Sequence, residues 1–193
     1  MGGLFLLVFL ALVAFWLVGA YNGLVSLKNQ VVNAWKQIDV QLKRRHDLIP
    51  NLVNAVKGAM EHERGTLEAV ITARNHAVNA QGVAATAKAE GELTGALNRL
   101  FALAESYPQI KATANIQQLQ EELSSTENKV AFARQLYNDT ATQYNTRQAQ
   151  FPTNLVVGLA KVSPAELWMI EEPAERAVPA VDLSRTTPPA PAA

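Results

Sequence analysis

Apolar residues fill the start of the chain almost without interruption and then recur at intervals of three or four residues. Seventeen of the first 20 residues are apolar, and the first charged side chain is Lys28. As a helix, residues 3–21 would be about 28 Å long, enough to cross the hydrocarbon core of a bilayer, which is about 30 Å thick. Trp16 and Tyr21 lie near one end of this run, where aromatic rings favour the membrane interface. The pattern predicts a transmembrane anchor over residues 1–21.

A cleaved signal peptide is the alternative interpretation of this apolar run. Val18-Gly19-Ala20 resembles a cleavage site, but no Lys or Arg precedes the run, and the run is longer than the apolar region of a typical signal peptide. We therefore favour a retained anchor. Lys28 and Lys36 follow the span, so the positive-inside rule favours a cytoplasmic position for the rest of the chain.

Beyond the anchor, the spacing of apolar residues predicts long amphipathic helices. Residues 24–49 contain neither Gly nor Pro, and an apolar stripe continues past Pro50, so we expect a kink there rather than a helix end. The stripe consists of Leu24, Val31, Trp35, Ile38, Leu42, Ile49, Leu52 and Val56. A second helical region covers residues 66–107. Gln81-Gly82 interrupts it, so this region counts as one helix or as two.

A third helix is predicted over residues 115–150, and Phe151-Pro152 ends it. Five of the nine prolines then fall in residues 173–191, and we interpret residues 161–193 as a Pro/Ala-rich flexible tail. No strand-like alternation competes with the helical pattern. The predicted fold class is therefore all-α: an N-terminal transmembrane helix followed by a long antiparallel helical bundle of three to four helices over residues 22–160.

Charge and cysteine content exclude several kinds of function. The chain has 17 basic and 17 acidic residues, so it carries no net charge, and we expect no nucleic-acid partner. It has no cysteine and therefore no disulfide, thiolate ligand or thiol nucleophile. The histidine that would complete a zinc motif begun by His62-Glu63 is replaced by Thr66, so we expect neither a metal site nor a cofactor.

Polar residues on the predicted helices are the remaining candidates for a site. Arg45 interrupts the apolar stripe, and we expect the charged cluster at residues 43–47 to form salt bridges with acidic residues on neighbouring helices, such as Glu121, Glu122 or Glu127. Such residues between packed helices usually form networks that fix the register of the helices. The candidate interaction or polar-network residues are Trp35, Arg45, Asn128, Arg134, Tyr137 and Asn138. We expect Trp35 to be buried in the bundle or in a contact between subunits.

Five blocks of the sequence form a recognisable series: NAWKQIDVQLKRRHDLIPNLV at 33–53, LEAVITARN at 67–75, LFALAESYPQIKA at 100–112, LQEELSSTENKVAFARQLYND at 119–139 and YNTRQAQFPTNLVVG at 144–158. In this order, the blocks resemble those of the LemA family. The resemblance implies a single-pass bacterial membrane protein with an antiparallel four-helix bundle, and it implies no reaction, cofactor or catalytic residue. His46 stands where relatives often carry Tyr, which argues against a catalytic role for it.

We therefore expect a non-enzymatic protein of the bacterial inner membrane that forms homo-oligomers or scaffolds other envelope proteins. The lipid bilayer would be its first partner. A sensor or adaptor, whose bundle binds a peptide or protein, is the alternative. An enzyme with an uncommon site around Asn128 and Arg134 is a third hypothesis, but the sequence contains no recognisable nucleophile with its base.

Overall fold

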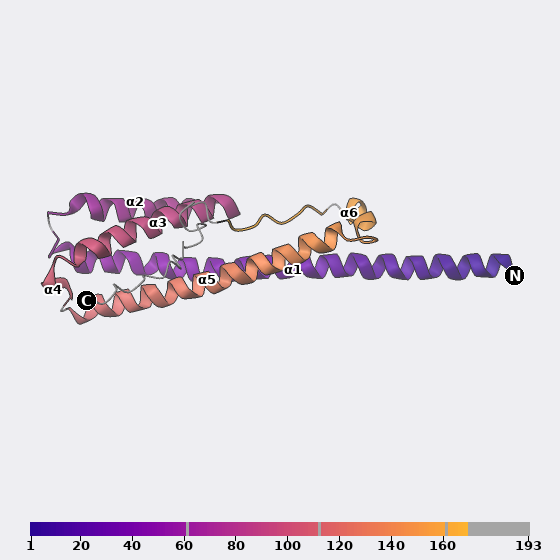
Figure 1. Cartoon of the computed structure of the whole chain (residues 1–193), viewed down its shortest axis with the longest axis horizontal. Coiled ribbons are helices and arrows are strands. Elements are labelled where there is room, and N and C mark those ends of the chain that lie inside the picture. The colour runs from indigo at the N-terminus through magenta and orange to yellow at the C-terminus, as the bar shows by residue number, and fades with distance from the viewer. Residues whose placement is uncertain (61, 112, 161, 170–193) are drawn as a thin grey trace, which may run out of the picture.

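The longest element of the protein is a single helix that begins at the N-terminus. Figure 1 shows the computed structural model, which describes residues 1–60, 62–111, 113–160 and 162–169. The first helix, α1 (Gly2–Lys57), runs without interruption through the apolar segment and the predicted stripe. It contains the 18-residue apolar window that is long enough to cross a membrane, and none of that window is buried against the rest of the protein. Pro50 lies inside the helix and does not end it.

The second helical region forms a hairpin of two helices, α2 (Arg64–Asn79) and α3 (Val83–Ala104). Gly82 separates them with a φ of 84°, a left-handed conformation that glycine adopts without steric cost. This answers the question that the sequence left open: residues 66–107 contain two long helices, and α4 (Pro108–Lys111) begins a further single turn.

The third predicted helix is α5 (Ala114–Ala149), which packs antiparallel along α1, and the short α6 (Asn154–Ala160) follows it. Figure 1 shows α2 and α3 beside the half of α1 that is distant from the N-terminus, and α6 beside α1 at the point where α1 leaves the bundle. Most of the described residues are helical, and none of them forms a strand. The predicted all-α fold, with an apolar N-terminal helix and a helical bundle, is confirmed.

Two hydrophobic cores divide the bundle along its length. The distal core joins the end of α1 to α2, α3, α4 and the start of α5, with Ile49, Leu93 and Leu100 almost fully buried. The proximal core joins the middle of α1 to the second half of α5, with Leu24 and Ile38 fully buried. The α2–α3 hairpin contributes most of its buried residues to the distal core, so the proximal core depends mainly on α1 and α5.

Residues 162–169 complete the proximal core, and we refer to them as the docked segment. They form no helix or strand, yet Trp168 is buried in the proximal core and Leu167 packs against it. The prediction of a flexible tail beginning at residue 161 is therefore wrong for the docked segment. The predicted tail over residues 170–193 lies outside the described residues.

Candidate interaction site on the α1–α5 pair

The docked segment is held on α5 by two asparagine side chains that bind its backbone. Asn138 Nδ2 donates to the Trp168 carbonyl (2.9 Å), and the Trp168 N–H donates to Asn138 Oδ1 (2.8 Å). Asn145 makes the same pair of bonds with Ala165, at 2.8 and 2.7 Å. Each side-chain amide thus pairs with one backbone N–H and one backbone carbonyl of the docked segment, which has no secondary structure to satisfy these groups.

The spacing of these two asparagines matches the geometry of an extended chain. Seven residues of helix, from Asn138 to Asn145, rise about 10.5 Å. Three residues of extended chain, from Ala165 to Trp168, cover about 10 Å. The segment therefore runs antiparallel to α5 with both pairs in register. These contacts recognise the backbone, so they place no demand on the side chains of the segment.

Side-chain recognition is concentrated at Trp168. Its ring centroid lies 6.0 Å from that of Trp35, and the Arg134 guanidinium lies 5.8 Å from the Trp168 centroid. Tyr137 makes an edge contact with Trp35 at 5.4 Å, and its hydroxyl donates to the Glu166 carbonyl (2.6 Å). Burial, together with the nearby Glu166 carboxylate, raises the pKa of Tyr137 above that of free tyrosine, so its hydroxyl stays protonated as a donor.

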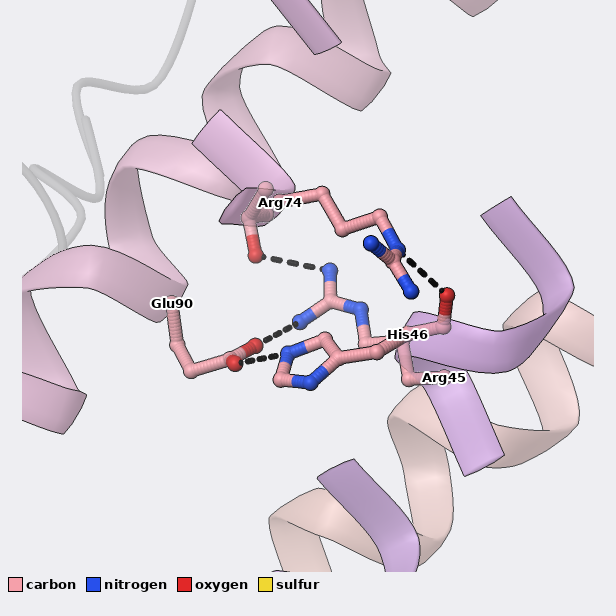
Figure 2. Close-up of polar contacts among 5 residues, drawn as sticks. Arg45, His46, Arg74 and Glu90 are labelled. Atoms are coloured by element: carbon pink, nitrogen blue, oxygen red, sulfur yellow. Dashed lines mark hydrogen bonds and ion pairs between the residues drawn. The ribbon is translucent and has the colours of Figure 1, made fainter. Parts of the chain in front are cut away.

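A second cluster of polar residues lies between the two hydrophobic cores. Arg45 Nη1 donates to Glu90 Oε2 (3.0 Å), and its Nη2 donates to Thr94 Oγ1 (2.9 Å). His46 Nε2 lies 2.6 Å from Glu90 Oε1 (Figure 2). Arg45 and Glu90 are only 4% and 3% exposed. Because two charges are withdrawn from water here, each depends on the other for compensation.

Arg74 supplies a hydrogen bond that Pro50 cannot make. In a helix, the N–H of residue 50 would donate to the carbonyl of His46, but proline has no N–H. Arg74 Nε donates to that carbonyl instead (2.8 Å), from α2, as Figure 2 shows. The proline therefore frees an acceptor on α1 that fixes the position of α2.

Two hollows flank this polar cluster. One, of about 710 Å³, is lined by Arg45, Glu90 and Thr94 and extends to Arg134 and Trp168. The other, of about 540 Å³, is lined by Trp35, His46 and Arg74 among others. The polar cluster and the docked segment thus border a common hollow, although their side chains come from different layers of the bundle.

A third groove, of about 470 Å³, lies between α1 and α5 and is apolar and solvent-exposed. Val40 of α1 is 63% exposed, and Phe132 and Leu136 of α5 are 73% and 46% exposed. Lys36 and Lys129 also line it. We refer to it as the lateral groove.

The structure brings together some of the predicted site residues and separates others. Trp35, Arg134, Tyr137 and Asn138 converge on the docked segment, with Trp35 half-buried. Asn128 lies apart from them, with its side chain exposed on α5. Arg45 belongs to the separate polar cluster.

Arg45 pairs with Glu90 on α3, an acidic residue on a neighbouring helix as expected, but not with the examples named, Glu121, Glu122 and Glu127 on α5. The sequence did not single out Glu90, because the alanine- and glycine-rich sequence of α3 gives little indication of which face meets α1. Trp168 and Glu90 were missed as site residues. The sequence offered one signal for each: Trp168 is a tryptophan within a proline-containing segment, and Glu90 is a glutamate on the same helical stripe as Thr86 and Leu93. Among the described residues, no group of His, Asp and Glu could hold a metal ion.

Comparison with known proteins shows similarity over most of the chain. The profile described as the LemA family matches residues 34–183, a range that includes the docked segment. Protein LemA of Metamycoplasma hominis is 29% identical over 158 residues, covering 79% of this chain and 70% of that protein. The magnetosome proteins MamQ 1 and MamQ 2 of Paramagnetospirillum magneticum are each 26% identical over 180 residues, covering 80% of this chain and 66% of theirs.

Proposed function

The chain belongs to the LemA family, and on that basis we propose that it is a single-pass, non-enzymatic scaffold that assembles side by side with copies of itself in the membrane. The observation that carries this proposal is the lateral groove. Exposed apolar residues that gather in one place on a protein usually mark an interaction surface. Val40, Phe132 and Leu136 form such a place on two neighbouring helices.

The position of the lateral groove suits association between anchored copies. Because α1 is continuous from the apolar segment into the bundle, the groove has a fixed height above the membrane in every copy. Anchoring also raises the effective concentration of copies and gives them a common orientation. A surface that is weak in solution can therefore assemble at the membrane.

The buried polar cluster supports a structural role for its residues. Arg45, Glu90, Thr94 and His46 bind one another, and Arg45 and Glu90 are nearly inaccessible to solvent. Groups satisfied in this way fix the register of helices rather than act on a substrate.

Cross-linking in native membranes, together with the mass of the protein extracted in mild detergent, tests the proposal. We expect oligomers of the natural chain and their loss in Phe132→Asp, which places a charge in the lateral groove. Ser124→Asp is the matched control, because it adds the same charge at an exposed position of α5 that does not line the groove. A natural chain that is monomeric in both experiments would refute the scaffold.

We place the bundle on the cytoplasmic side, following the positive charges that come after the span. Protease added outside intact spheroplasts should leave residues 161–193 uncut and should cut them after lysis. Cleavage of the tail in intact spheroplasts would reverse the orientation.

The docked segment favours a second candidate function, an adaptor that binds an extended peptide. Asn138 and Asn145 hold backbone atoms only, so a peptide from a partner could occupy the same positions. A fluorescent peptide with the sequence of residues 162–169 should bind Trp168→Ala more tightly than the natural chain, because the internal competitor is weakened. Equal or no binding to both proteins would count against the adaptor.

A further inference from the structure

The connection between α5 and α6, together with the first turn of α6, exposes large apolar side chains at the end of the bundle that faces the apolar segment of α1. Phe151 is 79% exposed and Leu155 is 63% exposed. Neighbouring residues hold this connection in place, because Thr153 and Val156 are almost fully buried. The two exposed side chains therefore belong to a fixed surface, which we call the α5–α6 turn (residues 150–157).

The α5–α6 turn lies at the level where α1 would leave the hydrocarbon. α6 packs on α1, and Val156 shares the proximal core with Ala20, while Leu17 is partly buried against that core. Residues 3–21 account for about 28 Å of helix, so the bilayer boundary falls near residues 17–21. Figure 1 shows α6 at this point, with the remainder of α1 extending beyond it and touching no other described part of the chain.

The charges at this end of the bundle match an anionic surface. Residues 1–38 and 140–160 contain no Asp or Glu, whereas they contain Lys28, Lys36 and Arg147. Lys28 lies seven residues beyond Tyr21, about 10 Å along α1, and Arg147 lies one turn before Phe151. Both are exposed, and both are close enough to the boundary to attract anionic headgroups.

From these three observations we propose that the α5–α6 turn inserts Phe151 and Leu155 into the interfacial layer of an anionic lipid bilayer, as a second membrane contact beside the span. Aromatic and aliphatic side chains at this depth are stabilised by the boundary between headgroups and acyl chains. The contact goes beyond the proposed assembly, since it concerns each copy alone, and it rests on α1 spanning the membrane. Its effect is to restrict the rotation of the bundle about the axis of α1.

The absence of cysteine makes this proposal directly testable. The full-length chain carrying one cysteine, Phe151→Cys or Leu155→Cys, is labelled with an environment-sensitive fluorophore and reconstituted into vesicles of phosphatidylcholine and phosphatidylglycerol. Lipids with a nitroxide high on the acyl chain then quench fluorophores that touch the bilayer. Leu12→Cys, within the apolar segment, reports whether α1 is inserted, and Ser124→Cys reports a position distant from the membrane.

We expect quenching at positions 151 and 155 to exceed that at 124 by roughly two-fold or more, because interfacial side chains lie about 5–10 Å deep. Quenching at 151 and 155 no greater than at 124, with normal quenching at 12, would overturn the second contact and leave the anchor intact. A blue-shifted but unquenched label would also overturn it, because protein rather than lipid would then cover the turn. Pure phosphatidylcholine should reduce the quenching, and equal values in both lipid compositions would overturn the contribution assigned to charge.

Discussion

Restoring the backbone N–H at position 50 should make the hydrogen bond from Arg74 to the His46 carbonyl dispensable. The perturbation is a double-mutant cycle of Pro50→Ala and Arg74→Met. Position 50 is exposed, so alanine fits without a clash. Methionine keeps much of the apolar stem of Arg74 and removes the donor that lies 2.8 Å from the carbonyl.

The structure sets the expected size of the effect. A hydrogen bond from a charged donor contributes about 1.5–3 kcal/mol, and loss of the donor leaves a backbone acceptor unsatisfied. The hollow beside His46 and Arg74 lets water replace part of this bond. We therefore expect Arg74→Met to cost about 1–2 kcal/mol in the natural background and about 0.5 kcal/mol or less beside Pro50→Ala. The coupling between the two positions is then about 1 kcal/mol.

Urea unfolding of the full-length chain in detergent micelles, followed by circular dichroism, measures the four free energies. Arg44→Met is the control, because Arg44 is an exposed arginine of α1 and its loss should show no coupling with Pro50→Ala. Equal costs of Arg74→Met in the two backgrounds would refute the reasoning. The bond from Arg74 would then be incidental to the proline.

Three further outcomes follow from the two clusters. Glu90→Gln should lower the free energy of unfolding in urea by about 2–4 kcal/mol, because it leaves the buried Arg45 charge uncompensated. The control Glu92→Gln, on the exposed face of α3, should lower it by less than about 1 kcal/mol. Similar losses for the two variants would contradict the importance of the buried pair. Trp168→Ala should lower the free energy of unfolding by at most about 3–5 kcal/mol and should release the docked segment. The released segment should be cleaved faster in limited proteolysis, and an unchanged cleavage rate would contradict the docking. Because the pKa of Tyr137 is raised in the folded state, the stability that Tyr137 contributes is complete below about pH 10 and is lost as the pH rises further. When the free energy of unfolding is measured against pH, Tyr137→Phe should therefore show a smaller decrease above about pH 10 than the natural chain.

The helices were predictable because their information is local. The stripe from Leu24 to Val56 repeats every three or four residues, and nearly all its members are buried in one face of α1. The sequence also indicated that Gly82 interrupts the second helical region, but its left-handed φ depends on how α2 and α3 fold back on each other. A local pattern therefore predicted where helices lie, and tertiary packing decided how they are divided.

The contacts of the candidate site depend on partners far away in the sequence. Asn138 was recognisable as a polar residue on a helix, but its partner is the backbone of Trp168, and backbone groups carry no sequence signal. Arg45 was recognisable as a charge within an apolar stripe, but only the rotation of α3 brings Glu90 to it. Sequence thus indicated which residues needed partners and left the identity of the partners to the fold.

The continuous helix α1 connects the apolar segment rigidly to the bundle, so a change in the angle of one end moves the other. From Tyr21 to Lys57 it extends about 54 Å, with no break among these residues to absorb a change in angle. Transmembrane helices commonly tilt in response to bilayer thickness, and a change of about 10° would move the distal end of the bundle sideways by about 9 Å. If α1 spans a bilayer, as we propose, the thickness of that bilayer would set the position of the α2–α3 hairpin.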